Sequence, residues 1–231
     1  MELGVSNPFS TRFTQPGRIE PLDTSGNLVN LIGLLDRLQW LGGAATLVGP
    51  HGSGKSTLLV HLADAIERRG DRVTRVRLHS WRDGLAAWAT IRRAAWGGVA
   101  CIDSWECLGY SARVLLRLVA RVSGCGLLVT SHHAAGLPVL ARCDTTADLL
   151  QSIVGKLPDY GQWHGRLIQT GDIEEAFITH HGNLRESLCE LYDRFEMRRH
   201  WQLTAGGDGS VGGDGGDGLW RGIHEIANGF S

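Results

Sequence analysis

Residues 49–57 read GPHGSGKST, and they constrain the fold more than any other part of this 231-residue chain. The five residues before them, AATLV, form a short apolar run bounded by glycines, which is typical of a buried strand. The residues after them carry apolar side chains at helical spacing until Gly70 ends the pattern. A glycine-rich turn from a buried strand into a helix is common in α/β proteins, so we expect that class of fold.

The same segment matches the pattern G-x-x-x-x-G-K-[ST] at every fixed position. Glycines let the backbone wrap around a polyphosphate with its N–H groups pointing inward, and the helix that follows presents its positive end to the anion. Lys55 is expected to contact the β- and γ-phosphates, and the Ser56 hydroxyl to ligate Mg²⁺. A chance glycine-rich turn is the alternative, but the flanking strand and helix favour nucleotide binding. The expected binding residues are Gly49, Pro50, His51, Gly52, Ser53, Gly54, Lys55, Ser56 and Thr57.

A second apolar run, VACID, ends in Asp103. Ligands bind at the carboxyl ends of the strands in open parallel sheets, so an acid there is placed to hold Mg²⁺ directly or through water. The alternative is an aspartate that merely caps the strand or the next helix. Beside the phosphate-binding pattern, we expect Asp103 to be a metal ligand.

The rest of the chain alternates strands and helices up to residue 144 and then becomes helical. Strands are expected at 44–48, 73–78, 98–103 and 126–131, with a short fifth at 137–140, and helices at 25–40, 58–69, 85–96 and 112–122. This pattern predicts a parallel sheet covered by helices on both faces. We expect an irregular arm over 1–24, an α/β nucleotide-binding domain over 25–144, a small helical subdomain over 145–200 and a Gly/Asp-rich tail over 201–231. Within the tail, 205–218 is expected to be a linker and 219–231 a short helix.

The order of these motifs resembles that of AAA+ and origin-recognition-type ATPases, over about residues 7–199. The resemblance implies a P-loop NTPase fold, Mg-ATP as cofactor, a helical lid and homo-oligomeric assembly. It implies that Ser131, or else Thr130, at the end of the fourth strand is the sensor 1 residue that contacts the γ-phosphate or the attacking water. It also implies that Asn7-Pro8-Phe9 and the helix before the loop pack near the adenine.

The lid contains Gly182-Asn183-Leu184-Arg185-Glu186, which resembles the start of an AAA+ lid helix. By this resemblance Arg185 is the sensor 2 arginine, which reaches the γ-phosphate. The alternative is an ordinary helix start with Asn183 as the N-cap. ATP is favoured over GTP because no guanine-reading signature surrounds either lysine, Lys55 or Lys156.

The chain departs from the resemblance at the catalytic acid. AAA+ ATPases carry a glutamate directly after the Walker B aspartate, but Ser104 stands there and Glu106 is the nearest carboxylate. Glu106 is the candidate general base, and the alternative is a residue that only begins the next helix. Three functions therefore stay open: an ATPase that couples Mg-ATP to lid movement, a nucleotide-binding switch or scaffold without significant hydrolysis, and a P-loop kinase or GTP-binding cofactor-assembly factor. No arginine finger can be assigned among Arg113, Arg117, Arg121 and Arg142.

The composition argues against some classes of protein but does not indicate a function. The formal net charge of −1 gives no overall attraction to nucleic acid, so a protein and a nucleic-acid partner both stay open. The five cysteines have neither disulfide-framework nor zinc spacing, and the adjacent histidines at 132–133 and 180–181 lack a third metal ligand. The sequence contains no apolar run of about 20 residues and no basic, apolar leader, so we expect no membrane and a cytoplasmic location.

Overall fold

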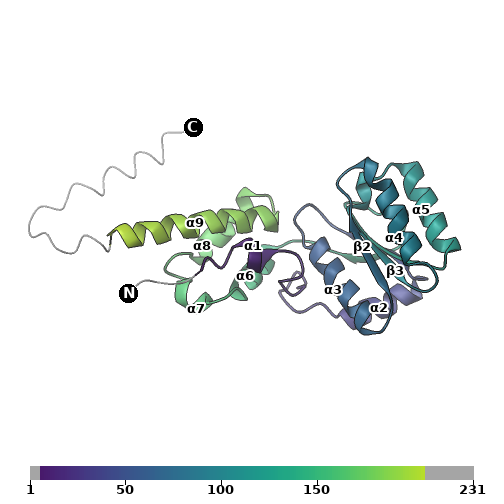
Figure 1. The fold of residues 1–231 in the computed structure, drawn as a ribbon. Coiled ribbons are helices and arrows are strands. Elements are labelled where there is room, and N and C mark those ends of the chain that lie inside the picture. Colours follow the sequence, from purple (N-terminus) through teal and green to yellow (C-terminus); the bar gives the residue numbers. More distant parts are fainter. Residues whose placement is uncertain (1–5, 206–231) are drawn as a thin grey trace, which may run out of the picture.

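The computed structural model describes residues 6–205 of the chain (Figure 1). The expected short helix at 219–231 and nearly all of the expected linker lie outside these residues. Across residues 6–205 no helix is both long and apolar enough to cross a membrane.

A five-stranded, all-parallel sheet forms the centre of the larger part of the molecule. Its strand order is β2-β3-β4-β1-β5, so β4 lies between β1 and β3. Its strands are β1 (Ala44–Val48), β2 (Val73–Arg77), β3 (Val99–Asp103), β4 (Gly126–Ser131) and β5 (Val139–Arg142). The three central strands, β1, β3 and β4, are buried on both faces, which explains why the sequence shows them as continuous apolar runs.

Helices cover both faces of the sheet, as expected. On one face α2 (Leu31–Trp40) and α3 (Lys55–Arg68) pack with Leu47 and Leu128. On the other face α4 (Gly84–Arg93) and α5 (Tyr110–Val122) pack with Ile102 and Val129. Alternate residues of the strands therefore enter separate apolar cores.

Two element boundaries differ from the predictions for local reasons. The helix expected from residue 25 begins at Leu31, because Asn30 Oδ1 accepts a hydrogen bond from Gly33 N at 3.0 Å and caps it there. The residues before it make a turn in which Asp23 Oδ1 accepts from the N–H groups of Ser25 and Asn27. The helix expected from Leu58 begins earlier, at Lys55, directly after the glycine-rich loop of residues 49–54.

The C-terminal helices form a second body with its own apolar core (Figure 1). They are α6 (Ala147–Gly155), α7 (Tyr160–Trp163), α8 (Thr170–Thr179) and α9 (Leu184–Ala205). The N-terminal arm, expected to be irregular, contains the one-turn helix α1 (Thr11–Thr14) and inserts Phe9 into this core against Trp163 and Phe195. Phe9 lies in a segment rich in Pro, Thr and Gly that shows no hydrophobic periodicity, so the sequence does not reveal this packing.

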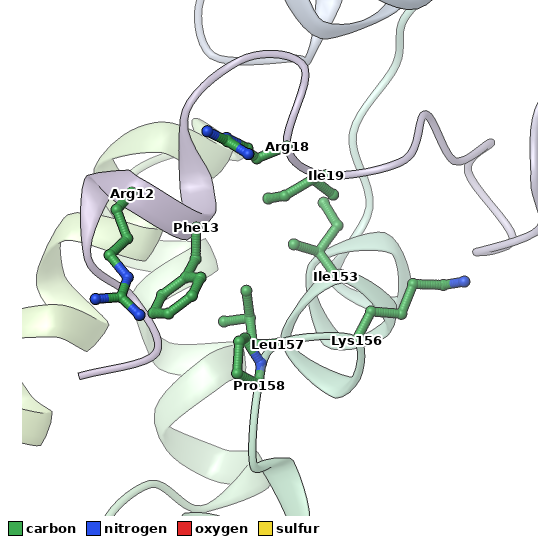
Figure 2. A pocket seen from close by; sticks show the side chains of 8 residues that line it. All are labelled: Arg12, Phe13, Arg18, Ile19, Ile153, Lys156, Leu157 and Pro158. Atoms are coloured by element: carbon green, nitrogen blue, oxygen red, sulfur yellow. The ribbon is translucent and has the colours of Figure 1, made fainter. Parts of the chain in front are cut away.

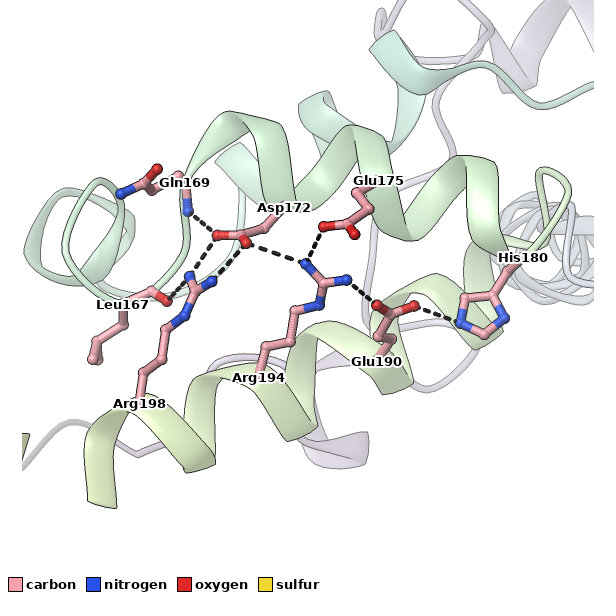
Figure 3. A network of polar contacts seen from close by, with 8 residues as sticks. All are labelled: Leu167, Gln169, Asp172, Glu175, His180, Glu190, Arg194 and Arg198. Atoms are coloured by element: carbon pink, nitrogen blue, oxygen red, sulfur yellow. Dashed lines mark hydrogen bonds and ion pairs between the residues drawn. The ribbon is translucent and has the colours of Figure 1, made fainter. Parts of the chain in front are cut away.

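Charged side chains join α8 to α9 on the surface of this body (Figure 3). Arg198 donates to both oxygens of Asp172, at 2.6 and 2.7 Å, and Arg194 donates to Asp172 and Glu175. Arg194 also pairs with Glu190, which contacts His180 at 2.8 Å. The network fixes the long α9 against α8 in a single register.

Candidate functional site

Three strand ends meet at one edge of the sheet. The strands β1, β4 and β3 are neighbours and parallel, so their carboxyl ends lie side by side. The glycine-rich loop follows β1, Thr130 and Ser131 end β4, and Asp103 ends β3. The topology therefore brings together the residues that the sequence assigns to the phosphate, sensor 1 and metal sites.

The glycine-rich loop has a backbone that favours glycine. Gly52 and Gly54 have φ angles of +70° and +85°, and Gly54 is directly followed by the first residue of α3. A methyl group on Gly49 would lie 2.4 Å from the carbonyl oxygen of Cys143. The buried Ser53 hydroxyl has no hydrogen-bond partner within the part of the chain that the structure describes. The loop thus leads tightly into the N-terminus of α3, where backbone N–H groups favour an anion.

Lys55 lies inside this loop with a side chain that is mostly buried. Its Nζ donates to the carbonyl oxygens of Gly49 and Pro50, at 2.7 and 2.5 Å. Burial lowers the pKa of Lys55, and the nearby carboxylates of Glu106 and Asp103 oppose that shift. Among the described residues, the hydrogen-bond partners of the ammonium group are these two backbone carbonyls, and a phosphate oxygen would be a stronger acceptor for it.

Ser56 and Asp103, the two predicted magnesium ligands, contact each other. Ser56 Oγ lies 2.9 and 3.1 Å from the two carboxylate oxygens of Asp103. A hydroxyl and a carboxylate are hard oxygen ligands of the kind Mg²⁺ prefers, and Mg²⁺ in nucleotide sites takes its other ligands from phosphates and water. Within residues 6–205 no group of three or more His, Cys, Asp or Glu side chains is arranged for a metal ion. The pair fits a magnesium site completed by a nucleotide, and it does not fit a metal site made by protein side chains alone.

Thr130, rather than Ser131, contacts Asp103, the candidate metal ligand. Thr130 Oγ1 donates to Asp103 Oδ1 at 2.6 Å and accepts from Ser104 N at 2.8 Å. Ser131 is similarly buried, but among the described residues the one contact of its hydroxyl is a long hydrogen bond from His133 N, at 3.4 Å. Neighbouring residues on a strand point to opposite faces, so only one of the two side chains faces Asp103.

Glu106 lies beside the loop, held by a histidine that sequence reasoning missed. It belongs to a 3₁₀ turn, Trp105–Cys107, which follows Ser104 in the left-handed conformation at φ +64°. Glu106 Oε1 lies 2.9 Å from His132 Nε2, and its buried Oε2 has no partner among the described residues. His132 directly follows the end of β4. Its position after a strand at the carboxyl edge of the sheet is the sequence feature that could have identified it as a site residue.

His132 connects Glu106 to the loop. Its Nδ1 lies 3.2 Å from the carbonyl oxygen of Gly49, and its ring packs against that of His51 with centroids 3.8 Å apart and the ring planes tilted by 44°. Both facing oxygens are acceptors, so both contacts are hydrogen bonds only when the imidazole carries two protons. Burial lowers the pKa of His132, and the carboxylate of Glu106 opposes that shift. The ring therefore holds Glu106 most firmly in its protonated form.

Helix α9 begins against the loop, and it belongs to the body of α6–α9 that the sequence predicts to be a lid. Asn183 Oδ1 accepts from the N–H groups of Arg185 and Glu186, at 3.2 and 3.3 Å, so the capping role is present. The same oxygen lies so close to Gly52 that a methyl group there would come within 1.8 Å of it. Arg185 N would lie 3.3 Å from that methyl group. Arg185 itself is exposed at the first turn of α9. The contact between its guanidinium group and the γ-phosphate stays a prediction.

The Asn-Pro-Phe segment lies on the lid. Asn7 Nδ2 donates to the carbonyl oxygen of Tyr192 and to Glu196 Oε1, at 3.1 and 2.9 Å. A pocket of about 420 Å³ opens near it, between the arm and the end of α6 (Figure 2). None of the predicted site residues lines this pocket, whose walls include Phe13, Ile153 and Leu157. It is therefore separate from the site at the sheet edge.

Comparison with protein-family models gives no match, and a search of curated proteins finds no significant match. The function must therefore be argued from the geometry at the sheet edge. That geometry combines a glycine-rich loop, one lysine, a serine–aspartate pair and a carboxylate held by a histidine.

Proposed function

We propose that this chain is a P-loop NTPase that binds Mg-ATP at the glycine-rich loop and couples it to movement of the α6–α9 lid, as AAA+ ATPases do. The observation that carries the proposal is the contact of Ser56 Oγ with Asp103 at 2.9 Å, directly beside the buried Lys55. A loop with two glycines in the left-handed region and a helix N-terminus behind it supports binding of an anion. The location we propose is the cytoplasm.

Each residue has a distinct role in this proposal. The loop N–H groups and Lys55 bind the phosphates, and Ser56 and Asp103 hold Mg²⁺, which neutralises charge on the phosphates when it is bound. Thr130 orients Asp103 through its 2.6 Å hydrogen bond. Glu106 accepts a proton from the attacking water, while Ser131 and Arg185 respond to the γ-phosphate.

Thermal melting with nucleotides tests the binding step. At a concentration 100 times the dissociation constant a ligand adds about 2.7 kcal/mol, which corresponds to about 5–10 °C for a chain of this size. Mg-ATP should give that shift for the wild type and for Lys156→Ala, which removes the only other lysine, and no shift for Lys55→Ala. No shift with millimolar ATP, ADP or GTP would overturn the proposal. A larger shift with GTP than with ATP would favour a GTP-binding assembly factor or kinase instead.

A second candidate is a nucleotide-dependent switch without significant turnover. It is favoured by Ser104, which stands directly after Asp103 where a hydrolytic AAA+ protein has its glutamate, and by the contact that ties Glu106 to His132. Steady-state phosphate release separates the two candidates. Turnover in the wild type that Glu106→Gln abolishes supports the ATPase. Binding without measurable turnover supports the switch.

A further inference from the structure

The outer surface of α4 and α5 exposes large apolar side chains. Leu85 and Trp88 on α4 are 80% and 46% exposed, and Leu115, Leu118 and Val122 on α5 are 59%, 57% and 75% exposed. In each helix the spacing of three to four residues places these side chains on one side. The opposite sides of both helices pack on the sheet, so this apolar surface is additional to the core.

These side chains form one surface, the α4–α5 face. The two helices follow neighbouring parallel strands, run in the same direction and pack against each other (Figure 1). Trp96, which is 83% exposed, follows α4 at one end of the face, where its backbone N–H donates to the backbone carbonyl oxygen of Ser123 just after α5. Trp96 has φ +65°, a conformation that favours glycine, so the backbone there is unfavourable for a large side chain that packs little. An apolar patch of this kind on a folded protein marks an interaction site.

The charge of this face is positive. The helices α4 and α5 contain five arginines and no acidic residue. Arg92 lies over the ring of Trp88 at 5.7 Å, and within residues 6–205 no ion pair is formed by Arg92, Arg93 or Arg121. A complementary partner would combine apolar side chains with carboxylates.

We propose that the α4–α5 face binds residues 206–231 of a second copy of this chain. That segment has four carboxylates and one arginine, a formal charge of −3, against the five arginines of α4 and α5. It also carries large apolar side chains close together near its end. The carboxylates are Asp208, Asp214, Asp217 and Glu225, and the apolar residues are Leu219, Trp220, Ile223, Ile226 and Phe230.

Distances along the chain indicate a second copy rather than the same one. α9 starts at the loop, at the carboxyl edge of the sheet, and extends away from it (Figure 1). Trp96 lies between the end of α4 and the start of β3, and therefore at the opposite edge. The 22 residues of α9 and the 13 residues of α5 together span about 50 Å at about 1.5 Å per residue. The 14 Cα–Cα steps from Ala205 to Leu219 reach about 50 Å only when that stretch is fully extended. Because full extension costs conformational entropy, we expect the contact to be head to tail between two copies and to depend on concentration.

Sedimentation velocity over a range of concentrations tests the proposal, which does not depend on nucleotide binding. The wild type is expected to self-associate, and both Leu118→Asp and a chain ending at residue 218 are expected to weaken the association at least tenfold. Ile178→Asp is the matched control, because Ile178 is 71% exposed on α8 and the same change there should have no effect. A synthetic peptide of residues 206–231 should compete with association of the wild type and should not bind Leu118→Asp.

Several outcomes would overturn the proposal. Association of the chain ending at 218 as strong as that of the wild type would exclude the C-terminal segment as the occupant. A wild type that stays monomeric up to about 0.1 mM and does not bind the peptide would exclude the contact altogether. Equal binding of the wild type and the shortened chain to anionic phospholipid vesicles, lost in Leu118→Asp, would assign the face to a membrane surface instead.

Discussion

Two buried threonines show how much a single hydrogen-bond partner matters at the scale of a residue. Thr46 on β1 and Thr130 on β4 are 0% and 1% exposed. Thr130 Oγ1 donates to Asp103 and accepts from Ser104 N, whereas Thr46 Oγ1 has no partner among the described residues. The same hydroxyl therefore has opposite energetic consequences at two similar positions, because an unpaired buried polar group is destabilising.

We predict that Thr130→Val lowers the free energy of unfolding by about 1–3 kcal/mol, because Ser104 N loses its acceptor in a buried setting. The matched change Thr46→Val removes an unpaired hydroxyl and should leave stability unchanged or raise it by about 1 kcal/mol. Urea unfolding of both variants at pH 7 measures the two values. Equal losses in the two variants would show that the hydrogen bonds of Thr130 are not the cause.

At this scale the sequence predicts contacts that follow from the fold class. Ser56 and Asp103 were both predicted to hold Mg²⁺, and they lie in contact because the phosphate-binding loop and the end of β3 share one edge of a parallel sheet. The contact of Glu106 with His132 was not predicted, because the two residues are far apart in the sequence and neither belongs to a periodic pattern. Side-chain pairing of this kind depends on a turn geometry, here the left-handed Ser104, that residue spacing does not encode.

At the scale of elements, two helices begin with the same type of cap in different surroundings. Asn30 caps α2 and Asn183 caps α9, each through its side-chain oxygen. Only Asn183 also lies against the glycine-rich loop, next to Gly52. The start of α9 therefore links the lid to the candidate nucleotide site.

We predict that Asn183→Ala and Asn30→Ala each lower stability by about 1 kcal/mol, since each removes an N-cap. Only Asn183→Ala should speed hydrogen exchange of the loop amides at 49–54 and reduce the Mg-ATP-dependent shift in melting temperature by half or more. Hydrogen exchange reports on the loop whether or not a nucleotide is bound. If both variants behave alike, the contact with Gly52 does not couple the lid to the loop.

The network between α8 and α9 makes the lid sensitive to acid. The hydrogen bonds from Arg198, supported by Gln169 N and Arg194, lower the pKa of Asp172 from 3.8 to about 2. A carboxyl group whose pKa is lower in the folded state stabilises the protein above its unfolded pKa. That contribution is full above about pH 4 and is lost as the pH falls toward 2.

Asp172→Asn should therefore lower the free energy of unfolding by about 2 kcal/mol at pH 7, as a shift of nearly two pKa units implies. Near pH 2.5 most of the difference from the wild type should disappear, because the carboxyl of the unfolded wild-type chain is then protonated while that of the folded chain is still largely ionised. Glu174→Gln, on the exposed side of the same helix, is the control and should change little at either pH. Urea titrations at the two pH values measure this, and a pH-independent loss would rule out the charge of Asp172 as the cause.

The sequence predicts the elements far better than their arrangement. The strands at 44–48 and 126–131 match the structure, because short apolar runs bounded by glycines leave few alternatives. The fifth strand lies at Val139–Arg142 rather than 137–140, since Pro138 has no backbone N–H and its carbonyl oxygen accepts from Thr46 N just before the strand begins. The position of β4 between β1 and β3 was not predicted, because alternation of strands and helices does not specify which strands are neighbours.

At the scale of the whole molecule, the N-terminal arm connects the two bodies of the structure. Phe9 lies in the core of the lid, and further along the arm the carbonyl oxygen of Ile19 contacts His61 on α3 at 3.0 Å. Thr146 Oγ1, at the start of α6, donates to the carbonyl oxygen of Thr24. The arm belongs to the lid by its apolar packing and touches the α/β part through a few polar contacts. If the lid moves on nucleotide binding, the first part of the arm should therefore move with it.

Because the two bodies have separate cores, we can predict which of them depends on Phe9 for its stability. Phe9 is 3% exposed and packs edge-on against Trp163, so Phe9→Ala should cost about 3–5 kcal/mol. Phe13, half-buried beneath Arg12, is the matched control, and Phe13→Ala should cost only about 1 kcal/mol. Because the lid and the sheet have separate cores, hydrogen exchange in Phe9→Ala should accelerate in α6, α8 and α9 and stay unchanged in β1, β3 and β4. Equal acceleration in the strands would mean that the two bodies unfold as one unit, and the arm would then stabilise the whole molecule rather than the lid.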